Sequence, residues 1–90
     1  MFSNTLQSIQ GKSFSDTQLR MAKQIVSSNW LTAMQIKEIA RIFSFEDTKL
    51  ELAKYAYGYC YDPNNYWQIN DVFSFESTIE ELDEFIRRGR

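Results

Sequence analysis

A five-residue segment recurs three times along the chain, and its spacing limits the fold more than any other feature of the sequence. The copies read SFSDT, SFEDT and SFEST and begin at Ser13, Ser44 and Ser74, so they are 31 and 30 residues apart. A period of about 30 residues holds two short helices and their turns, the usual unit of α-helical repeat proteins. We therefore predict one domain over residues 1–90 with about two and a half α-hairpin units. The expected units are 13–43 and 44–73, followed by a terminal helix within 74–90.

Apolar spacing and helix-start residues predict an all-α fold of five to six short helices. Within the expected helices, apolar residues recur at i, i+3 and i+7, which is the spacing of a core-facing stripe. The predicted stripe residues are Leu19, Ala22, Val26, Ile36, Ile39, Phe43, Leu50, Ala53, Tyr57, Cys60, Ile79, Leu82 and Ile86. The expected ranges are 4–10, 16–28, 33–43, 47–60, 66–73 and 78–88. Side-chain caps are predicted at four positions that are followed three residues later by Gln or Glu: Ser15, Thr32, Asn65 and Ser77.

One segment, residues 55–61, alternates tyrosine with smaller residues and by itself is typical of a β-strand. A lone strand would leave its backbone groups unpaired, and no other segment offers a partner strand. The repeat also aligns this segment with the helical pattern that begins at Leu19. We therefore predict a helix in which Tyr55 and Tyr59 lie on one side, with Tyr57 and Tyr61 roughly opposite.

Composition excludes most of the chemistry that small domains perform. The chain has no His, and Cys60 is its only Cys. It therefore cannot form a Ser-His-Asp triad, a Cys-His pair, a His-ligated metal site, a two-cysteine zinc site or an internal disulfide. An EF-hand calcium loop starting at Asp62 would need Gly and Glu where the chain has Trp67 and Phe73. We expect no cofactor, no metal and no enzymatic activity.

Charge is distributed unevenly along the chain. Residues 1–45 carry five Lys or Arg against two Asp or Glu, whereas residues 46–90 carry five against ten. A net charge of −2 argues against nucleic acid as a partner, because such binding needs basic residues gathered on one face. The basic residues of the first half, Arg20, Lys23, Lys37 and Arg41, ordinarily serve solubility on exposed helix faces. The alternative is weak head-to-tail self-association, in which this basic half of one copy meets the acidic last helix of another. Residues 1–7 do not show the basic start and apolar run of a secretion signal, and no apolar run approaches the length that crosses a membrane. From the residues alone, we therefore expect a soluble chain without a membrane span.

Aromatic residues are numerous for a chain of this length, with 2 Trp, 5 Tyr and 7 Phe. Burial in a small core is the ordinary role of such residues. The alternative is an exposed patch for a protein partner, since Tyr and Trp are preferred anchors of interfaces. The candidate interaction surface combines aromatic and basic side chains: Tyr55, Tyr59, Tyr61, Tyr66, Trp67, Arg20 and Lys23, with Trp30 as a further aromatic candidate.

Three functions are compatible with these residues. The first is a non-catalytic helical module that binds a protein partner or packs against neighbouring domains. The second is a small hydrolase that uses two carboxylates, which requires a cleft and a carboxyl group of raised pKa. Its candidate residues are Glu46, Asp47, Asp62 and Asp71. The third is a carbohydrate-binding domain, for which the tyrosines are the only indication.

Three motifs span much of the chain: Phe14-x-x-x-x-Leu19-x-x-Ala22-Lys23, Asn29-x-Leu31-Thr32-x-x-Gln35-Ile36 and Phe43-Ser44-Phe45-x-x-x-Lys49-Leu50-x-x-Ala53-Lys54. They are followed by Tyr57, Tyr61-Asp62, Asn65-Tyr66 and Phe73-Ser74-Phe75. Together these residues resemble the bacterial domain of unknown function 4476 family over residues 5–86. That family has no assigned catalytic residues, so the resemblance implies no activity. Its members commonly sit in exported proteins of Bacteroidetes-type bacteria. The resemblance therefore implies a domain of an exported or cell-envelope protein.

Overall fold

The structure is a computed structural model that describes residues 2–11 and 15–89, and these residues form helices joined by short turns. The elements in chain order are α1 (Phe2–Gln10), α2 (Ser15–Asn29), α3 (Ala33–Ala40), α4 (Glu46–Tyr57), the 3-10 helix η1 (Pro63–Val72) and α5 (Glu76–Arg88). No strand occurs in the two described ranges. The predicted all-α fold is therefore confirmed.

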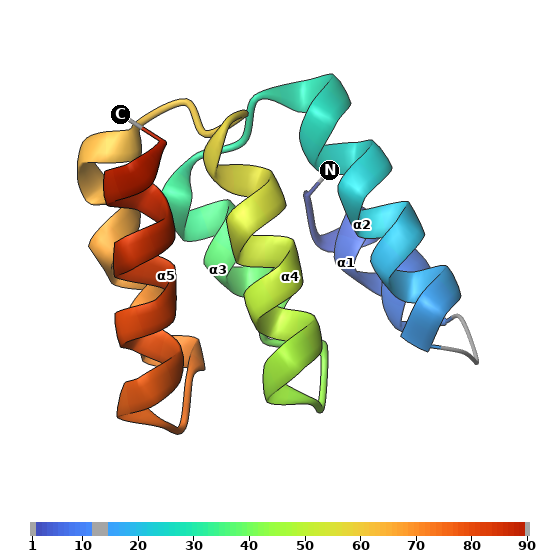
Figure 1. Cartoon of the computed structure of the whole chain (residues 1–90). Helices are drawn as coiled ribbons and strands as arrows, with labels where there is room; N and C mark the ends of the chain where they lie inside the picture. Colours follow the sequence, from blue (N-terminus) through green and yellow to red (C-terminus); the bar gives the residue numbers. More distant parts are fainter. Residues whose placement is uncertain (1, 12–14, 90) are drawn as a thin grey trace.

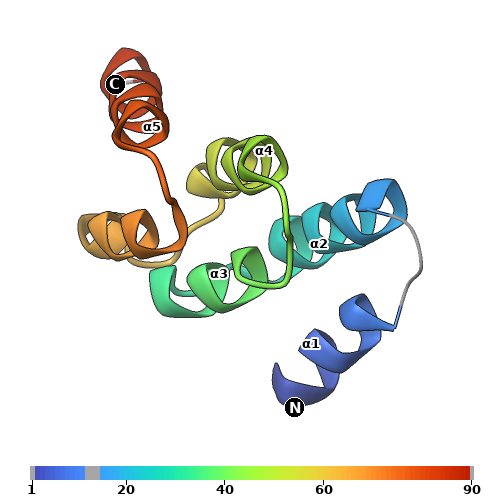
Figure 2. The same cartoon turned by 90° about the horizontal axis from the view of Figure 1, so that it is seen from below.

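The helices lie in two layers. Helices α2, α4 and α5 lie side by side in one layer (Figure 1, Figure 2). The other layer consists of α1, α3 and η1, of which η1 is the unlabelled orange helix. The first layer has helices starting at residues 15, 46 and 76, and the second at residues 2, 33 and 63. Both layers therefore advance along the chain by 31 and then 30 residues, which is the spacing of the recurring segment.

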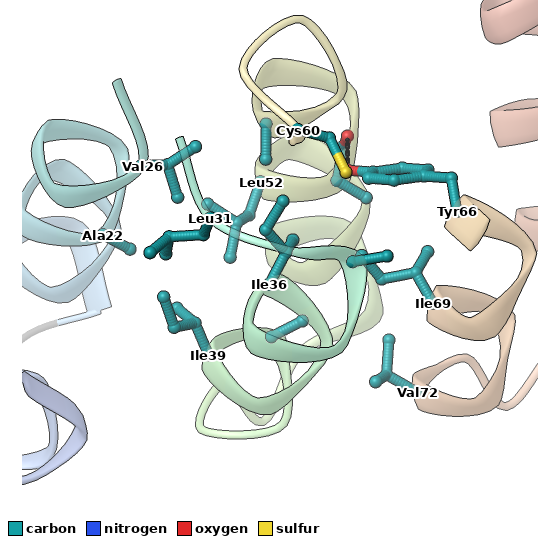
Figure 3. Packing of buried hydrophobic residues seen from close by; sticks show 14 of the residues in the cluster. Ala22, Val26, Leu31, Ile36, Ile39, Leu52, Cys60, Tyr66, Ile69 and Val72 are labelled. Carbon is teal, nitrogen blue, oxygen red and sulfur yellow. Dashed lines mark hydrogen bonds between the residues drawn. The ribbon is translucent and has the colours of Figure 1, made fainter. Parts of the chain in front are cut away.

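One apolar core fills the space between the layers. Val26 of α2, Ile36 of α3 and Leu52 of α4 converge in it (Figure 3). Most residues of the predicted stripes are buried: Ala22, Val26, Ile36, Ile39, Phe43, Leu50, Ala53, Cys60 and Leu82. Four others pack against the edge of this core and are only partly buried: Leu19, Tyr57, Ile79 and Ile86.

Of the four predicted caps, the one at Thr32 is confirmed. The Gln35 backbone N–H donates to Thr32 Oγ1 at 3.2 Å, and the Thr32 N–H donates to Gln35 Oε1 at 3.0 Å. The caps predicted at Asn65 and Ser77 are wrong, because both residues lie inside a helix. The cap predicted at Ser15, with Phe14 before it, depends on atoms outside the described part of the chain.

The fifth element differs from the α-helix predicted over 66–73, because it is a longer 3-10 helix over Pro63–Val72. Pro63 at its start has a fixed φ that suits a helical first turn. Its buried residues Tyr66, Ile69 and Val72 are three residues apart, which is one turn of a 3-10 helix. The tighter helix therefore turns all three toward the core.

Two helices end earlier than predicted. Helix α3 stops at Ala40 rather than 43, and α4 stops at Tyr57 rather than 60. Tight turns follow α4, where the Cys60 N–H donates to the Tyr57 carbonyl oxygen at 3.3 Å. The rings of Tyr55 and Tyr59 still lie on one side, with centroids 5.4 Å apart. Tyr57 packs instead against Tyr66, at a centroid distance of 5.0 Å.

Tyr66 connects η1 to α4 through a buried hydrogen bond, and we expect Tyr66→Phe to lower the free energy of unfolding by about 1 kcal/mol. Its hydroxyl donates to the Ala53 carbonyl oxygen at 2.5 Å, and the residue is only 3% exposed. Urea denaturation would measure the change, with the exposed Tyr61→Phe as the matched control. Equal effects of the two substitutions would contradict a stabilising role for the buried hydroxyl.

Candidate functional site

Three aromatic side chains, which we call the aromatic row, line up where the end of α2 meets α4: Tyr55, Tyr59 and Trp30. The ring centroids of Tyr59 and Trp30 are 6.0 Å apart in an edge-to-face arrangement, and Tyr55 continues the row beyond Tyr59. Tyr55 and Trp30 are exposed, whereas Tyr59 is half-buried. A hydrogen bond with Tyr55 raises the pKa of Tyr59.

Trp30 has an unusual backbone conformation. Its φ is 49°, in the left-handed region, and it is the only non-glycine residue with positive φ in the described ranges. A bulky residue is disfavoured there by contacts between its Cβ and the backbone, at a cost of about 1 kcal/mol. Trp30 is nevertheless 57% exposed, so burial of its ring does not explain the choice of residue. Strained, exposed side chains of this kind are concentrated at functional sites.

The basic candidates Lys23 and Arg20 adjoin the aromatic row. Lys23 Nζ lies 2.6 Å from Glu51 Oε2 and 5.3 Å from the ring centroid of Tyr55. Arg20, Lys23 and Glu51 line a shallow cavity of about 270 Å³ between α2 and α4. The structure therefore places the aromatic row and the two basic residues on neighbouring parts of one surface.

The same contact recurs between α4 and α5. Lys54 Nζ lies 2.8 Å from Glu81 Oε2 and 5.6 Å from the ring centroid of Phe85. Lys54 is 31 residues after Lys23, and Glu81 and Phe85 are each 30 residues after Glu51 and Tyr55. Neighbouring helices of this layer are thus joined by equivalent sets of one lysine, one glutamate and one aromatic ring.

The remaining aromatic candidates lie elsewhere. Tyr61 is in the loop after α4, where its N–H donates to the Leu31 carbonyl oxygen at 2.8 Å and its side chain is exposed. Trp67 is 66% exposed on η1, in the opposite layer from α4. Tyr66 is buried, so its prediction as a surface residue is wrong. Its ring points into the core beside Cys60 (Figure 3), and its hydroxyl is satisfied there by the Ala53 carbonyl.

A second cavity, of about 310 Å³, lies between η1 and α5. Asn64, Trp67 and Asn70 line it from η1, and Asp83 and Ile86 line it from α5. Trp67 was a candidate from the sequence, whereas the two asparagines and Asp83 were not predicted as site residues. Their spacing could have indicated a shared surface, because residues 64, 67 and 70 are three apart and a 3-10 helix aligns such residues along one edge.

Three of the four carboxylates considered for a hydrolase each have a different partner, so the four do not form one site. Asp62 Oδ1 accepts the Ala33 N–H at 2.7 Å, and Asp71 Oδ2 pairs with Lys37 Nζ at 2.9 Å. The hydrogen bond with Lys37 and its charge hold the pKa of Asp71 below its ordinary value. Asp47 is exposed at the start of α4.

Glu46 binds the backbone that leads into α5. Its carboxylate accepts the N–H of Ser74 at 3.0 Å and that of Phe75 at 3.1 Å. Desolvation by itself raises the pKa of Glu46, but these hydrogen bonds and the nearby Lys49 outweigh it and lower the pKa below its ordinary value of 4.5. Phe75 supplies no side-chain cap, and Glu46 satisfies the backbone N–H of this N-cap residue from a distant part of the chain.

We expect Glu46→Gln to destabilise the fold by about 1 kcal/mol at neutral pH, because a charged acceptor of two N–H groups becomes neutral. A carboxylate whose pKa falls on folding stabilises fully above its unfolded pKa, and this contribution is lost as the pH falls through the folded value. The difference between the two proteins should therefore shrink on acidification, as followed by thermal unfolding from pH 7 to pH 3. Glu76→Gln, at the equivalent exposed position of α5, is the control. An equal loss in both variants would contradict the role of Glu46.

Other reactive groups offer little chemistry. Burial raises the pKa of the Cys60 thiol to about 11, which keeps it protonated and unreactive. Within residues 2–11 and 15–89, no group of three or more Cys, Asp or Glu is placed to hold a metal ion. No helix of this part of the chain has both the length and the apolar character required to cross a membrane.

Comparison with known proteins identifies the family of this chain. No curated protein and no solved structure gave a match. One family model, described as a domain of unknown function (DUF4476), matches residues 1–86. Since the match includes nearly all of the 90 residues, the resemblance noted in the sequence is confirmed, and the chain belongs to the DUF4476 family of domains of unknown function.

Proposed function

We propose that the chain is a non-catalytic helical module that binds a protein partner through the aromatic row. The observation that carries this proposal is Trp30, which is largely exposed although its backbone has the unfavourable left-handed conformation. Tyr55 and Tyr59 extend the exposed ring surface, and Lys23 lies beside it. Tyr and Trp supply large contact areas with few rotatable bonds, which is why they are common at the energetic centres of interfaces.

A hydrolase is less well supported. Three of the four candidate carboxylates, Glu46, Asp62 and Asp71, have lowered pKa values, whereas a general acid needs a raised one. Each of the three already accepts hydrogen bonds that stabilise a helix start or a contact between elements.

Self-association head to tail is the second candidate, and we expect it to be weak. Lys23 is already paired with Glu51, and three acidic residues of α5 have partners within the molecule: Glu81 with Lys54, Asp83 with Arg87 and Glu84 with Arg88. Of the two basic residues on α2, Arg20 forms no ion pair within the described ranges, so it is the one whose charge is available to a second copy. Sedimentation at low and high salt would test this. Tight, salt-independent dimers would contradict the expectation.

Trp30→Gly provides a sharp test of the aromatic row. Glycine accepts positive φ without strain, so this substitution removes the ring while leaving the end of α2 folded. Partners would be captured with the unaltered chain from extracts of the source cell, purified, and titrated by calorimetry. We expect Trp30→Gly to weaken partner binding at least about 30-fold, as for an interface residue worth 2 kcal/mol.

Trp67→Ser is the matched control, because Trp67 is similarly exposed but lies on η1. It should change the affinity of the same partner less than about 3-fold. Equal loss in both variants, or a partner that binds Trp30→Gly as tightly as the unaltered chain, would overturn the proposed function.

A further inference from the structure

The cavity between η1 and α5 interrupts the pattern of packing in the rest of the molecule. Two of its lining residues, Asn70 and Asp83, have equivalents 30 residues earlier in Ala40 of α3 and Ala53 of α4. Both alanines are fully buried in the core. The third pair of helices therefore has polar side chains where the preceding pair has small apolar ones.

The first pair of helices, like the second, has buried apolar residues at these two positions. The residues another 31 positions earlier are Ile9 of α1 and Ala22 of α2, and both are also fully buried. Asn70 and Asp83 are thus the exceptions at two facing positions that are otherwise apolar. Asp83 is exposed and Asn70 is half-buried, so this part of the third pair forms an open cavity where the other two pairs form packed core. Positions that break an otherwise consistent pattern in this way are expected at functional sites.

The 3-10 helix adds a second feature to this cavity. With about three residues per turn, it aligns Asn64, Trp67 and Asn70 along the edge that faces α5. One edge of η1 therefore presents an amide, an indole ring and a second amide. Each amide can donate and accept hydrogen bonds at the same time, whereas the indole ring offers a flat apolar face.

The lining also limits the charge of a ligand. Asp83 is the only charged residue among those that line the cavity, and its carboxylate is paired with Arg87. An anion such as a phosphate would meet no cation inside the cavity and one carboxylate. The volume of about 310 Å³ is at the small end of ligand pockets, which suits a molecule of one or two sugar rings.

From these residues we infer that the cavity between η1 and α5 binds a small neutral saccharide. One face of the sugar, made of C–H groups, stacks on Trp67, while its hydroxyl groups exchange hydrogen bonds with Asn64, Asn70 and Asp83. A sugar hydroxyl both donates and accepts, so amides and a carboxylate are suitable partners for it. This site is separate from the aromatic row and does not depend on the proposed protein partner.

Nuclear magnetic resonance titration of the full chain with methyl glucoside, methyl galactoside and N-acetylglucosamine would test the site. We expect at least one sugar to shift the signals of Asn64, Trp67 and Asn70, with a Kd on the order of 1 mM, as is usual for a ligand of this size. Trialanine, a neutral peptide, serves as the alternative ligand. Failure of all three sugars, shifts confined to other residues, or the same shifts with trialanine alone would overturn the inference.

A double variant, Asn70→Ala with Asp83→Ala, separates binding from folding. It restores the residues that α3 and α4 have at these positions, and alanine is also the better helix former, so Tm should not fall by more than about 4 °C. Sugar binding should nevertheless weaken at least about 10-fold. Trp67→Ala should weaken it similarly, whereas Glu80→Ala, on the exposed part of α5, and Trp30→Gly should not. A double variant that keeps full sugar affinity would contradict the site.

Discussion

Replacing Leu52 with alanine is expected to lower the free energy of unfolding by about 3 kcal/mol. Leu52 is fully buried in the middle of α4, in the core between the two layers. The substitution removes three carbon atoms from a closely packed region and leaves a void that the neighbouring helices fill only in part. A domain of this length has a total stability of about 5–13 kcal/mol, so the loss is a large share of it.

Thermal unfolding would show the effect of Leu52→Ala as a fall in Tm of about 15 °C. Met34→Ala is the control, because Met34 lies on α3 with about half of its surface exposed. It should change stability by no more than about 0.5 kcal/mol. If the two substitutions had equal effects, the assignment of Leu52 to the centre of the core would be wrong.

Asp62→Ala is expected to have the next largest effect, a loss of about 2 kcal/mol. One carboxylate oxygen accepts the N–H of Ala33 at the start of α3, and the other accepts the Asn65 side-chain amide at 2.9 Å. Asp62 thereby fixes the loop before η1 to the first turn of a helix 29 residues earlier in the chain. Its negative charge also suits the positive end of the α3 dipole.

The contribution of Asp62 should depend on pH. The hydrogen bond from Asn65, followed by that from Ala33, holds the pKa of Asp62 below its ordinary value of 3.8. Its stabilisation is therefore complete above the unfolded pKa and disappears as the pH falls through the lower folded value. The gap between Asp62→Asn and the unaltered chain should be widest near neutral pH and close at strongly acidic pH. A gap of constant size, or an equal effect of Asp47→Asn, would refute this account.

Local patterns predicted the helical class and most of the core. The i, i+3 and i+7 stripes selected residues such as Ile36 and Ala53, which are fully buried, because an amphipathic helix must turn its apolar side inward. The capping box at Thr32 was also predictable, since all of its atoms come from four consecutive residues.

Features that depend on distant residues were not predictable in this way. Asp62 and Glu46 bind helix starts from 28 or 29 residues away, so no local motif marks them. Tyr66 was misplaced because tyrosine suits an interface as well as a core. Its acceptor, the Ala53 carbonyl, comes from another helix, so no local pattern indicated its burial. The cavity with Asn70 and Asp83 required knowing which two helices face each other.

The recurring lysine contacts have a consequence for engineering the length of this protein. Lys23 connects α2 to α4, and Lys54 connects α4 to α5, so each contact joins only immediate neighbours. A chain in which residues 46–75 were duplicated would carry a further lysine, glutamate and aromatic ring for its added helix. We therefore expect that a chain lengthened in this way would join its added helix to its neighbours by the same kind of contact.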